Sequence, residues 1–228
     1  MNQQHSCAIS IFLFILIITI CIYHNAQATK NLDITIVFNN AGYIVTGFFD
    51  HTTLDSQLAN LECNATACVK VTHHFLQLML QKKLKGCILF TSSVSGYIPN
   101  PFAVMYGATK AFVSQFAASL AAEVRGSGID VLAVHPSPVA SNFFDNAHKL
   151  ESLGMAQKAA VLPNSVPNKM LMCVGRCHLG DLGSMATIVR VVVALVPYDF
   201  LSGVFSFAAP VMGDYQKNNV TRGYITKK

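Results

Sequence analysis

The sequence predicts an α/β fold in which helices flank a parallel β-sheet. Three short apolar runs, the first of them rich in β-branched residues, each end in a turn, and longer stretches with helical periodicity separate them. Parallel strands require such crossover connections. The 228 residues are 52% hydrophobic and only 12% charged, which suits one domain with a sizeable core and excludes a disordered chain.

The first strand and helix follow from local pattern. Residues 33–38 are apolar and β-branched and lead into the loop 39–42, so they are expected to form a buried strand. Apolar residues then recur every three or four positions over residues 52–83, which predicts a helix. Thr52 with Asp55 resembles a capping box at its start.

Two more strands are expected at residues 86–91 and 129–134, with an alanine-rich helix at 105–125 between them. His135 and Pro136 stop the third strand. These alternating elements complete the predicted parallel sheet.

The C-terminal third has a weaker pattern. Residues 147–177 are polar with little helical signal, and we interpret them as a flap or a substrate-side insertion. Residues 181–212 are apolar again, and 185–196 are expected to form a core or membrane-surface helix.

The N-terminus carries an uncharged apolar run at residues 8–23. A membrane-spanning helix needs about 20 residues, so this run is close to a short anchor or a signal-peptide core. Ala26-Gln27-Ala28 resembles a cleavage site, but no Lys or Arg precedes the run. We expect residues 1–28 to form an uncleaved, membrane-associated apolar helix. Cleavage after Ala28, giving a secreted chain, and a buried pair of strands are the alternatives.

Charge and cysteine content narrow the function classes. The net charge of +5 is dispersed, and the basic residues 82–85 suit a helix C-terminus, so nucleic acid is not an expected partner. The seven cysteines lack the density of a disulfide scaffold. Cys173, Cys177 and His178 have no second cluster to complete a metal site, and His73-His74 is interpreted as a helix-surface pair, so no metal is expected.

Small and polar residues follow all three predicted strands. Because the carboxyl ends of parallel strands meet at one edge, these exits should open onto one crevice. Tyr106 and Lys110 are four residues apart and would share one helical face, where an ammonium group can lower the pKa of a phenol. Alone, such pairs are common on solvated helices. The exits are Asn39-Asn40-Ala41-Gly42, Thr91-Ser92-Ser93 and Pro136-Ser137-Pro138.

The order of these motifs resembles the short-chain dehydrogenase/reductase family. Asn-Asn-Ala-Gly follows one strand, Ser-Ser-x-x-Gly the next, Tyr-x-x-x-Lys begins thirteen residues beyond Ser93, and a later strand ends in Pro136. The resemblance covers residues 31–146 and implies a Rossmann-like sheet. The family's Thr-Gly-x-x-x-Gly-x-Gly turn does not occur before Asn39, so the first βαβαβ half is expected to be missing. The strand at 33–38 would then have an unpaired edge.

The resemblance also implies roles for matching residues. Tyr106 would exchange a proton with the substrate, Lys110 would lower its pKa and bind the nicotinamide ribose, and Ser93 would hold the substrate oxygen. Ser92 and Ser95 are alternatives to Ser93. The implied catalytic residues are Asn64, which would position a water molecule, Ser93, Tyr106 and Lys110; the implied cofactor-binding residues are Asn40, Ala41, Gly42, Tyr106, Lys110, Pro136 and Val139.

Two of the matching positions raise questions. Asn64 also begins an Asn-Ala-Thr glycosylation sequon, although its place in a helix argues against a glycan. Ser137 stands where the family usually has Gly, which leaves the local backbone conformation open.

The expected function is NAD- or NADP-dependent carbonyl reduction or alcohol oxidation on a hydrophobic lipid-, acyl- or steroid-like substrate. Residues 29–146 would form the catalytic core and 147–228 the substrate-side region. Without the glycine-rich turn this chain would be inactive. The alternatives are a non-catalytic, membrane-tethered remnant that binds a partner through its open strand edge, and a secreted binding domain. The endoplasmic reticulum membrane, through residues 1–28, and a second copy of the chain are the other expected partners.

Overall fold

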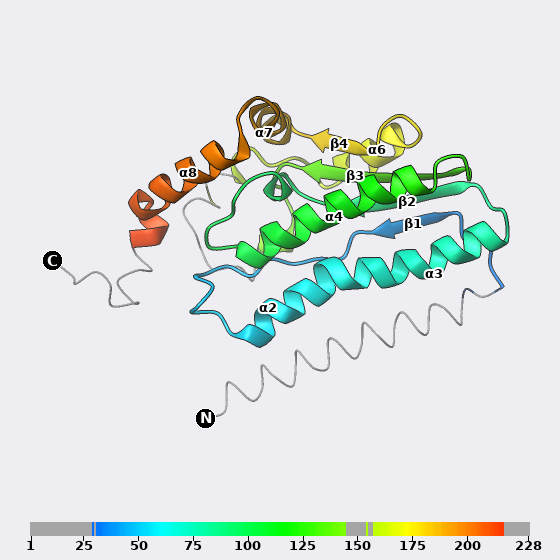
Figure 1. Ribbon diagram of the computed structural model, residues 1–228, viewed down its shortest axis with the longest axis horizontal. Helices are drawn as coiled ribbons and strands as arrows, with labels where there is room; N and C mark the ends of the chain where they lie inside the picture. Colours follow the sequence, from blue (N-terminus) through cyan, green and yellow to red (C-terminus); the bar gives the residue numbers. More distant parts are fainter. Residues whose placement is uncertain (1–28, 30, 145–153, 155–156, 217–228) are drawn as a thin grey trace.

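The computed structural model describes residues 29, 31–144, 154 and 157–216. They form an α/β fold around a parallel four-stranded sheet, as expected (Figure 1). The apolar helix expected at residues 1–28 and the domain boundary expected after residue 146 lie outside the described residues. The strands, in their order across the sheet, are β1 (Ile36–Asn39), β2 (Gly86–Thr91), β3 (Ile129–Pro136) and β4 (Leu179–Leu182).

Helices cover the two faces of the sheet unequally. On one face α3 packs against β1, and α4 packs against β2 and β3, while on the other face α6 packs against β3 and β4. The described helices are α2 (Leu54–Leu61), α3 (Ala67–Gln81), α4 (Val104–Glu123), α6 (Ser165–Cys173), α7 (Ser184–Leu195) and α8 (Tyr198–Ala208).

Alternation along the strands separates two hydrophobic cores. Side chains of successive residues point to opposite faces of a strand. Ile88 and Phe90 of β2 therefore join the core under α3 and α4. Leu89, between them, joins Leu132 of β3 and Met170 in the core under α6.

Among the described residues, helices cover the outer strand β1 on one face alone. Val37 is buried in the core under α3 and α4, whereas Ile36 and Phe38 point to the other face and are each 49% exposed. Within the part of the chain that the structure describes, β1 pairs with β2 alone. An unpaired apolar strand edge was expected here, and the exposed sheet face beside it is an additional feature.

The helix expected over residues 52–83 is interrupted. A π-helical turn, Glu62–Thr66, separates α2 from α3. The expected cap at Thr52 is wrong by one residue, because the Thr53 hydroxyl accepts the hydrogen bond from Ser56 N (3.3 Å). The Thr52 hydroxyl instead donates to the carbonyl group of Phe49 (3.1 Å). Three residues after Thr53 comes Ser56 and not an acidic residue, so the capping-box pattern pointed to the wrong threonine, although either threonine can cap a helix.

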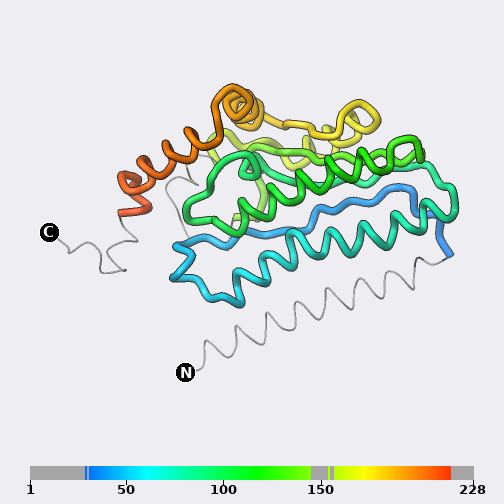
Figure 2. The backbone as a smooth tube through the Cα atoms, viewed as in Figure 1, coloured from blue at the N-terminus to red at the C-terminus, as the bar shows by residue number. Residues whose placement is uncertain are grey.

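The C-terminal region contains more regular structure than its sequence indicates. Helix α6 lies within the stretch interpreted as a flap, and β4 was not expected at all. That strand is four residues long and buries only Gly180, too little to give a periodic signal. The helix expected at residues 185–196 is present as α7. Figure 2 shows the backbone leaving the sheet through α7 and continuing along α8 away from the body of the fold.

Gly86 fixes the approach of β1 to β2, and its replacement by alanine tests this packing. A Cβ atom there would collide with the carbonyl oxygen of Thr35 and lie 2.9 Å from Cε of Met79. We expect Gly86→Ala to lower the free energy of unfolding by about 1–3 kcal/mol, as overpacking does. Urea unfolding followed by circular dichroism measures this.

The control is Gly203→Ala on α8, where a Cβ atom would meet nothing within 4 Å. Because alanine is the better helix former, this change should stabilise α8 by about 0.5–1 kcal/mol. Equal unfolding free energies for the Gly86→Ala chain and the unaltered chain would contradict the packing described.

Candidate functional site

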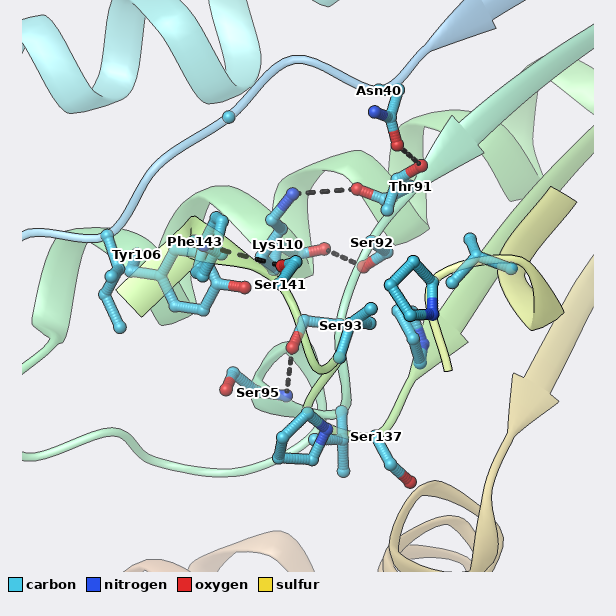
Figure 3. Close-up of a pocket in the computed structure, with 18 of the residues that line it drawn as sticks. Asn40, Thr91, Ser92, Ser93, Ser95, Tyr106, Lys110, Ser137, Ser141 and Phe143 are labelled. Carbon is cyan, nitrogen blue, oxygen red and sulfur yellow. Dashed lines mark hydrogen bonds between the residues drawn. The ribbon is translucent and has the colours of Figure 1, made fainter. Parts of the chain in front are cut away.

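The carboxyl ends of β1, β2 and β3 open onto one cavity of about 670 Å³ (Figure 3). This confirms that the three strand exits meet, as the parallel topology requires. Of the nine residues predicted for the site, all except Asn64 line this cavity. They are Asn40, Ala41, Gly42, Ser93, Tyr106, Lys110, Pro136 and Val139.

Tyr106 lies in the first turns of α4 and is buried against the cavity. Burial raises the pKa of Tyr106 to about 12, and the nearby side chain of Ser93 opposes this rise. The ring of Phe143 lies beside it, with ring centroids 5.8 Å apart. The phenol is therefore neutral at physiological pH and can donate a proton to an oxygen atom in the cavity.

Lys110 lies one turn further along α4 and is also buried. Its Nζ donates a hydrogen bond to the carbonyl oxygen of Thr91 (2.8 Å) and lies 5.7 Å from the ring centroid of Tyr106. Burial lowers the pKa of Lys110 to about 8, and the nearby thiols of Cys68 and Cys63 oppose this. The expectation that Lys110 lowers the pKa of Tyr106 is not met in this structure, because desolvation of the phenol dominates.

The geometry distinguishes between the neighbouring serines. Ser93 Oγ accepts a hydrogen bond from Ser95 N (3.2 Å) and interacts with the phenol of Tyr106. Ser92 Oγ instead donates to the carbonyl oxygen of Lys110 (2.9 Å) and lies 2.8 Å from Ser114 Oγ. Ser92 therefore fastens α4 to the end of β2, and Ser93 is the serine whose hydroxyl meets the phenol.

Asn64 lies in the π-helical turn, and its buried side chain holds a loop of the cavity. Its Oδ1 accepts from Tyr43 N (3.0 Å), and its Nδ2 donates to Tyr43 O (2.9 Å). A Cβ atom at the neighbouring Gly42 would lie 3.1 Å from the same Oδ1. Asn64 thus fixes the segment that follows β1, and in this fold its side-chain amide is buried where a glycan has no room.

Ser137 has a structural use of its own. Its Oγ accepts a hydrogen bond from Ala186 N (3.0 Å) in the first turn of α7. Gly183, with φ of +90°, lies so close that a Cβ atom would stand 2.5 Å from Ser137 Oγ. Ser137 is not among the described non-glycine residues with positive φ, so it needs no glycine-type backbone conformation.

Sequence reasoning missed the apolar wall of the cavity. These side chains come from the turn after β3 and from α6 and α7, where the sequence has weak periodicity. The wall residues are Phe143, Phe144, Val166, Met170 and Met185.

A buried polar network beneath the cavity was also missed. His135 Nε2 bonds Ser114 Oγ (2.7 Å), and its ring stacks on Tyr97 with centroids 4.4 Å apart. The Tyr97 hydroxyl in turn donates to Asp181 Oδ1 (2.9 Å). Burial lowers the pKa of His135 to about 4, so the imidazole is neutral at physiological pH. The network ties α4, β3 and β4 together behind Ser93.

Among the described residues, no group of three or more His, Cys, Asp or Glu side chains is placed to hold a metal ion.

The chain is similar to known proteins over about half of its length. The family model described as short chain dehydrogenase matches residues 22–151, more than half of the chain. Serine 3-dehydrogenase of Rhizobium radiobacter is 32% identical over 112 residues, which are 49% of this chain and 44% of that protein. The very-long-chain 3-oxoacyl-CoA reductase of Pyricularia oryzae is 34% identical over 107 residues, 46% of this chain and 32% of that one. The chain thus spans less than half the length of these curated relatives.

Solved structures share the fold. A structure from a study of 7beta-hydroxysteroid dehydrogenase stereoselectivity matches with a TM-score of 0.68 and 21% identity, covering 79% of this chain and 70% of that one. Other matching structures are described as complexes with NADP or with NADH.

The burial of Lys110 predicts a pH dependence of stability. The pKa of lysine is about 10.4 in an unfolded chain, against about 8 in the fold. Between these values the unfolded state binds more protons, so this residue makes stability rise with pH. We expect the free energy of unfolding of the unaltered chain, minus that of the Lys110→Met chain, to rise by about 3 kcal/mol from below pH 8 to above pH 10.

Chemical denaturation across this pH range measures the difference. Lys158→Met removes a solvent-exposed lysine and serves as the matched control, with a difference that should stay constant. Parallel pH curves for the unaltered and Lys110→Met chains would contradict the burial of an ionisable amine at this position.

Proposed function

Because the chain belongs to the short-chain dehydrogenase family, we propose that it represents an oxidoreductase that reduces a carbonyl group or oxidises an alcohol with NAD or NADP. The observation that carries this proposal is the meeting of the Tyr106 phenol and the Ser93 hydroxyl in an apolar cavity, with the Lys110 ammonium group one helical turn away. Few other reactions call for a neutral phenol beside a hydroxyl donor and a buried amine.

Each residue has a proposed part in the chemistry. Ser93 holds the substrate oxygen, and Tyr106 donates a proton to it during reduction or accepts one during oxidation. Lys110 binds the nicotinamide ribose, for which its Nζ has two donors left beside the bond to Thr91 O. Asn64 acts by fixing the loop at Gly42 and Tyr43. Because its side-chain amide already bonds Tyr43, the water molecule that Asn64 would position would bond the backbone of Asn64.

The cavity wall indicates the substrate class. Its aromatic and aliphatic side chains favour a hydrophobic body, while the polar atoms gather around Tyr106 and Ser93. The relatives that act on long acyl chains and the structure from work on a hydroxysteroid dehydrogenase support the same class. We propose a lipid-, acyl- or steroid-like ketone or alcohol.

The residues present fit one end of the cofactor. We propose that Lys110, Pro136 and Val139, which line the cavity, hold nicotinamide and its ribose, and that Asn40, Ala41 and Gly42 line the adenine and ribose side. The bound cofactor would supply the hydride. The pyrophosphate normally rests on a glycine-rich turn, and this sequence has none before Asn39.

We also propose the division of the chain and the membrane location that the sequence predicts. Residues 29–146 would supply the catalytic groups, and residues 147–228 the substrate side, a division supported by Val166 and Met170 in the cavity wall. Membrane attachment at the endoplasmic reticulum through residues 1–28 is proposed from their composition. No single helix among the described residues is long and apolar enough to cross a membrane.

The test is a pair of measurements on the whole chain. Binding of NADH and NADPH is followed by cofactor fluorescence, and oxidation of the reduced cofactor by absorbance with a long-chain 3-oxoacyl thioester or a ketosteroid. We expect Tyr106→Phe to reduce any measured rate by about 10²–10⁴-fold, the usual contribution of a general acid, while the other proposed cofactor contacts remain in place.

Tyr198→Phe, an equivalent change on the exposed surface of α8, is the control and should leave the rate unchanged. Equal rates for Tyr106→Phe and the unaltered chain would overturn the proposed role. Absence of cofactor binding at millimolar concentration would favour the second candidate below.

A non-catalytic binding protein is the second candidate, and the exposed side of β1 favours it. Ile36 and Phe38 present apolar surface next to backbone groups that no described strand pairs, which suits the addition of a strand from another chain. Under this proposal the cavity residues are present but catalyse no reaction.

A charge on β1 should reduce its association with other chains. We expect Ile36→Lys to shift the chain toward the monomer in light scattering and sizing, because edge lysines oppose strand pairing. Leu171→Lys, an exposed site on α6, is the control and should not cause this shift. Identical association of the Ile36→Lys and unaltered chains would contradict self-association through the β1 edge.

A further inference from the structure

Helices α7 and α8 form a protruding apolar elbow, defined here as residues 184–211. The two helical segments bend by 119° at Val196 and Pro197. Leu195 and Phe207 are 78% and 86% exposed, more than any other large apolar side chain among the described residues. The exposed large apolar side chains of the elbow are Ile188, Val191, Val192, Leu195, Tyr198, Phe200, Val204, Phe207 and Val211.

The part of the chain that the structure describes does little to cover this surface. Helix α8 buries none of its residues, and α7 buries only Ala186. Arg190 and Asp199 are the only charged residues in the elbow, and Arg190 Nη1 is bonded to the Tyr97 hydroxyl (2.6 Å). A helix on the surface of a globular protein normally presents charged or polar residues to water. The elbow instead presents aromatic and branched side chains.

The shape and length of the elbow suit a membrane surface. Figure 1 shows α8 extending away from the sheet on the side where the strands end. The helices have 12 and 11 residues, too few for either to span a bilayer, which needs about 20. Helices of this length with bulky apolar side chains can lie within the interface between headgroups and acyl chains.

The charge of the following segment favours lipid over a protein partner. After Asp214 the sequence contains Lys217, Arg222, Lys227 and Lys228 and no acidic residue. Basic residues beside an apolar segment are attracted to anionic lipid, by roughly a fivefold gain in affinity for each residue near the surface. An apolar elbow joined to a basic segment is therefore complementary to an anionic bilayer.

We propose that the elbow is a docking surface that lies in the interface of an anionic membrane, with Leu195 and Phe207 inserted. It is a membrane contact separate from residues 1–28. Met185, at the start of α7, lines the cavity, so docking would place the cavity close to lipid. That last point rests on the proposed hydrophobic substrate, whereas the docking itself does not.

The absence of tryptophan from the sequence allows a direct test. Phe207→Trp in the full chain puts a single indole reporter on α8, and Leu80→Trp puts one on α3, at a 45% exposed site near the basic residues 82–85. Both chains are mixed with vesicles of phosphatidylcholine containing a minor fraction of phosphatidylserine. Emission wavelength and quenching by brominated lipids are recorded. Neither readout depends on catalysis, so the result stands whether or not the chain proves to be an oxidoreductase.

We expect the Phe207→Trp reporter to shift to shorter wavelength and to be quenched, and the Leu80→Trp reporter to show neither change. Attachment through residues 1–28 alone would carry both reporters to the vesicle without burying the indole on α8. Three results would overturn the proposal. They are an unquenched Phe207→Trp reporter, equal quenching of both reporters, and a shift without lipid that grows with protein concentration, which would identify a second copy of the chain as the occupant.

Discussion

The attachment of α4 to the end of β2 is the constraint on which the site depends. The carbonyl oxygen of Lys110 accepts hydrogen bonds from the hydroxyls of Ser92 and Ser114, and the ammonium group of Lys110 donates to the carbonyl oxygen of Thr91. One residue of the helix is thereby held through both its main chain and its side chain. Because Tyr106 is one turn away on the same helix, these bonds also set the position of the phenol. The strand exits, together with apolar side chains from the turn after β3 and from α6 and α7, supply the remaining walls.

Burial sets the protonation of Tyr106 and Lys110, and burial of the charged amine also destabilises the fold. Desolvation keeps the phenol protonated and makes the charged form of the amine less favourable. An isolated buried ammonium group destabilises a fold, and such groups are common where a ligand later supplies their partners. The neutral His135 beneath the site carries no such penalty, and its hydrogen bond to Ser114 continues the attachment of α4 into β3.

Much of the fold and site could be predicted because the signals were local. Strand exits, helical spacing and the parallel topology placed Ser93, Tyr106 and Lys110 around one crevice. The rest depended on tertiary contacts. Strand β4 exists because it pairs with β3, and the apolar wall comes from α6 and α7, whose residues show their use only when packed. The protonation of Tyr106 likewise could not be predicted from spacing, since desolvation depends on the complete surroundings.

Phe38 belongs to two surfaces at once. It lines the cavity, and it also stands half exposed on the side of β1 that α6 does not reach. None of the residues that the structure describes therefore closes the crevice along that flank. Any element that sheltered this phenylalanine, from the same polypeptide or another, would at the same time enclose the reaction space, so that assembly and the exclusion of water would be a single event.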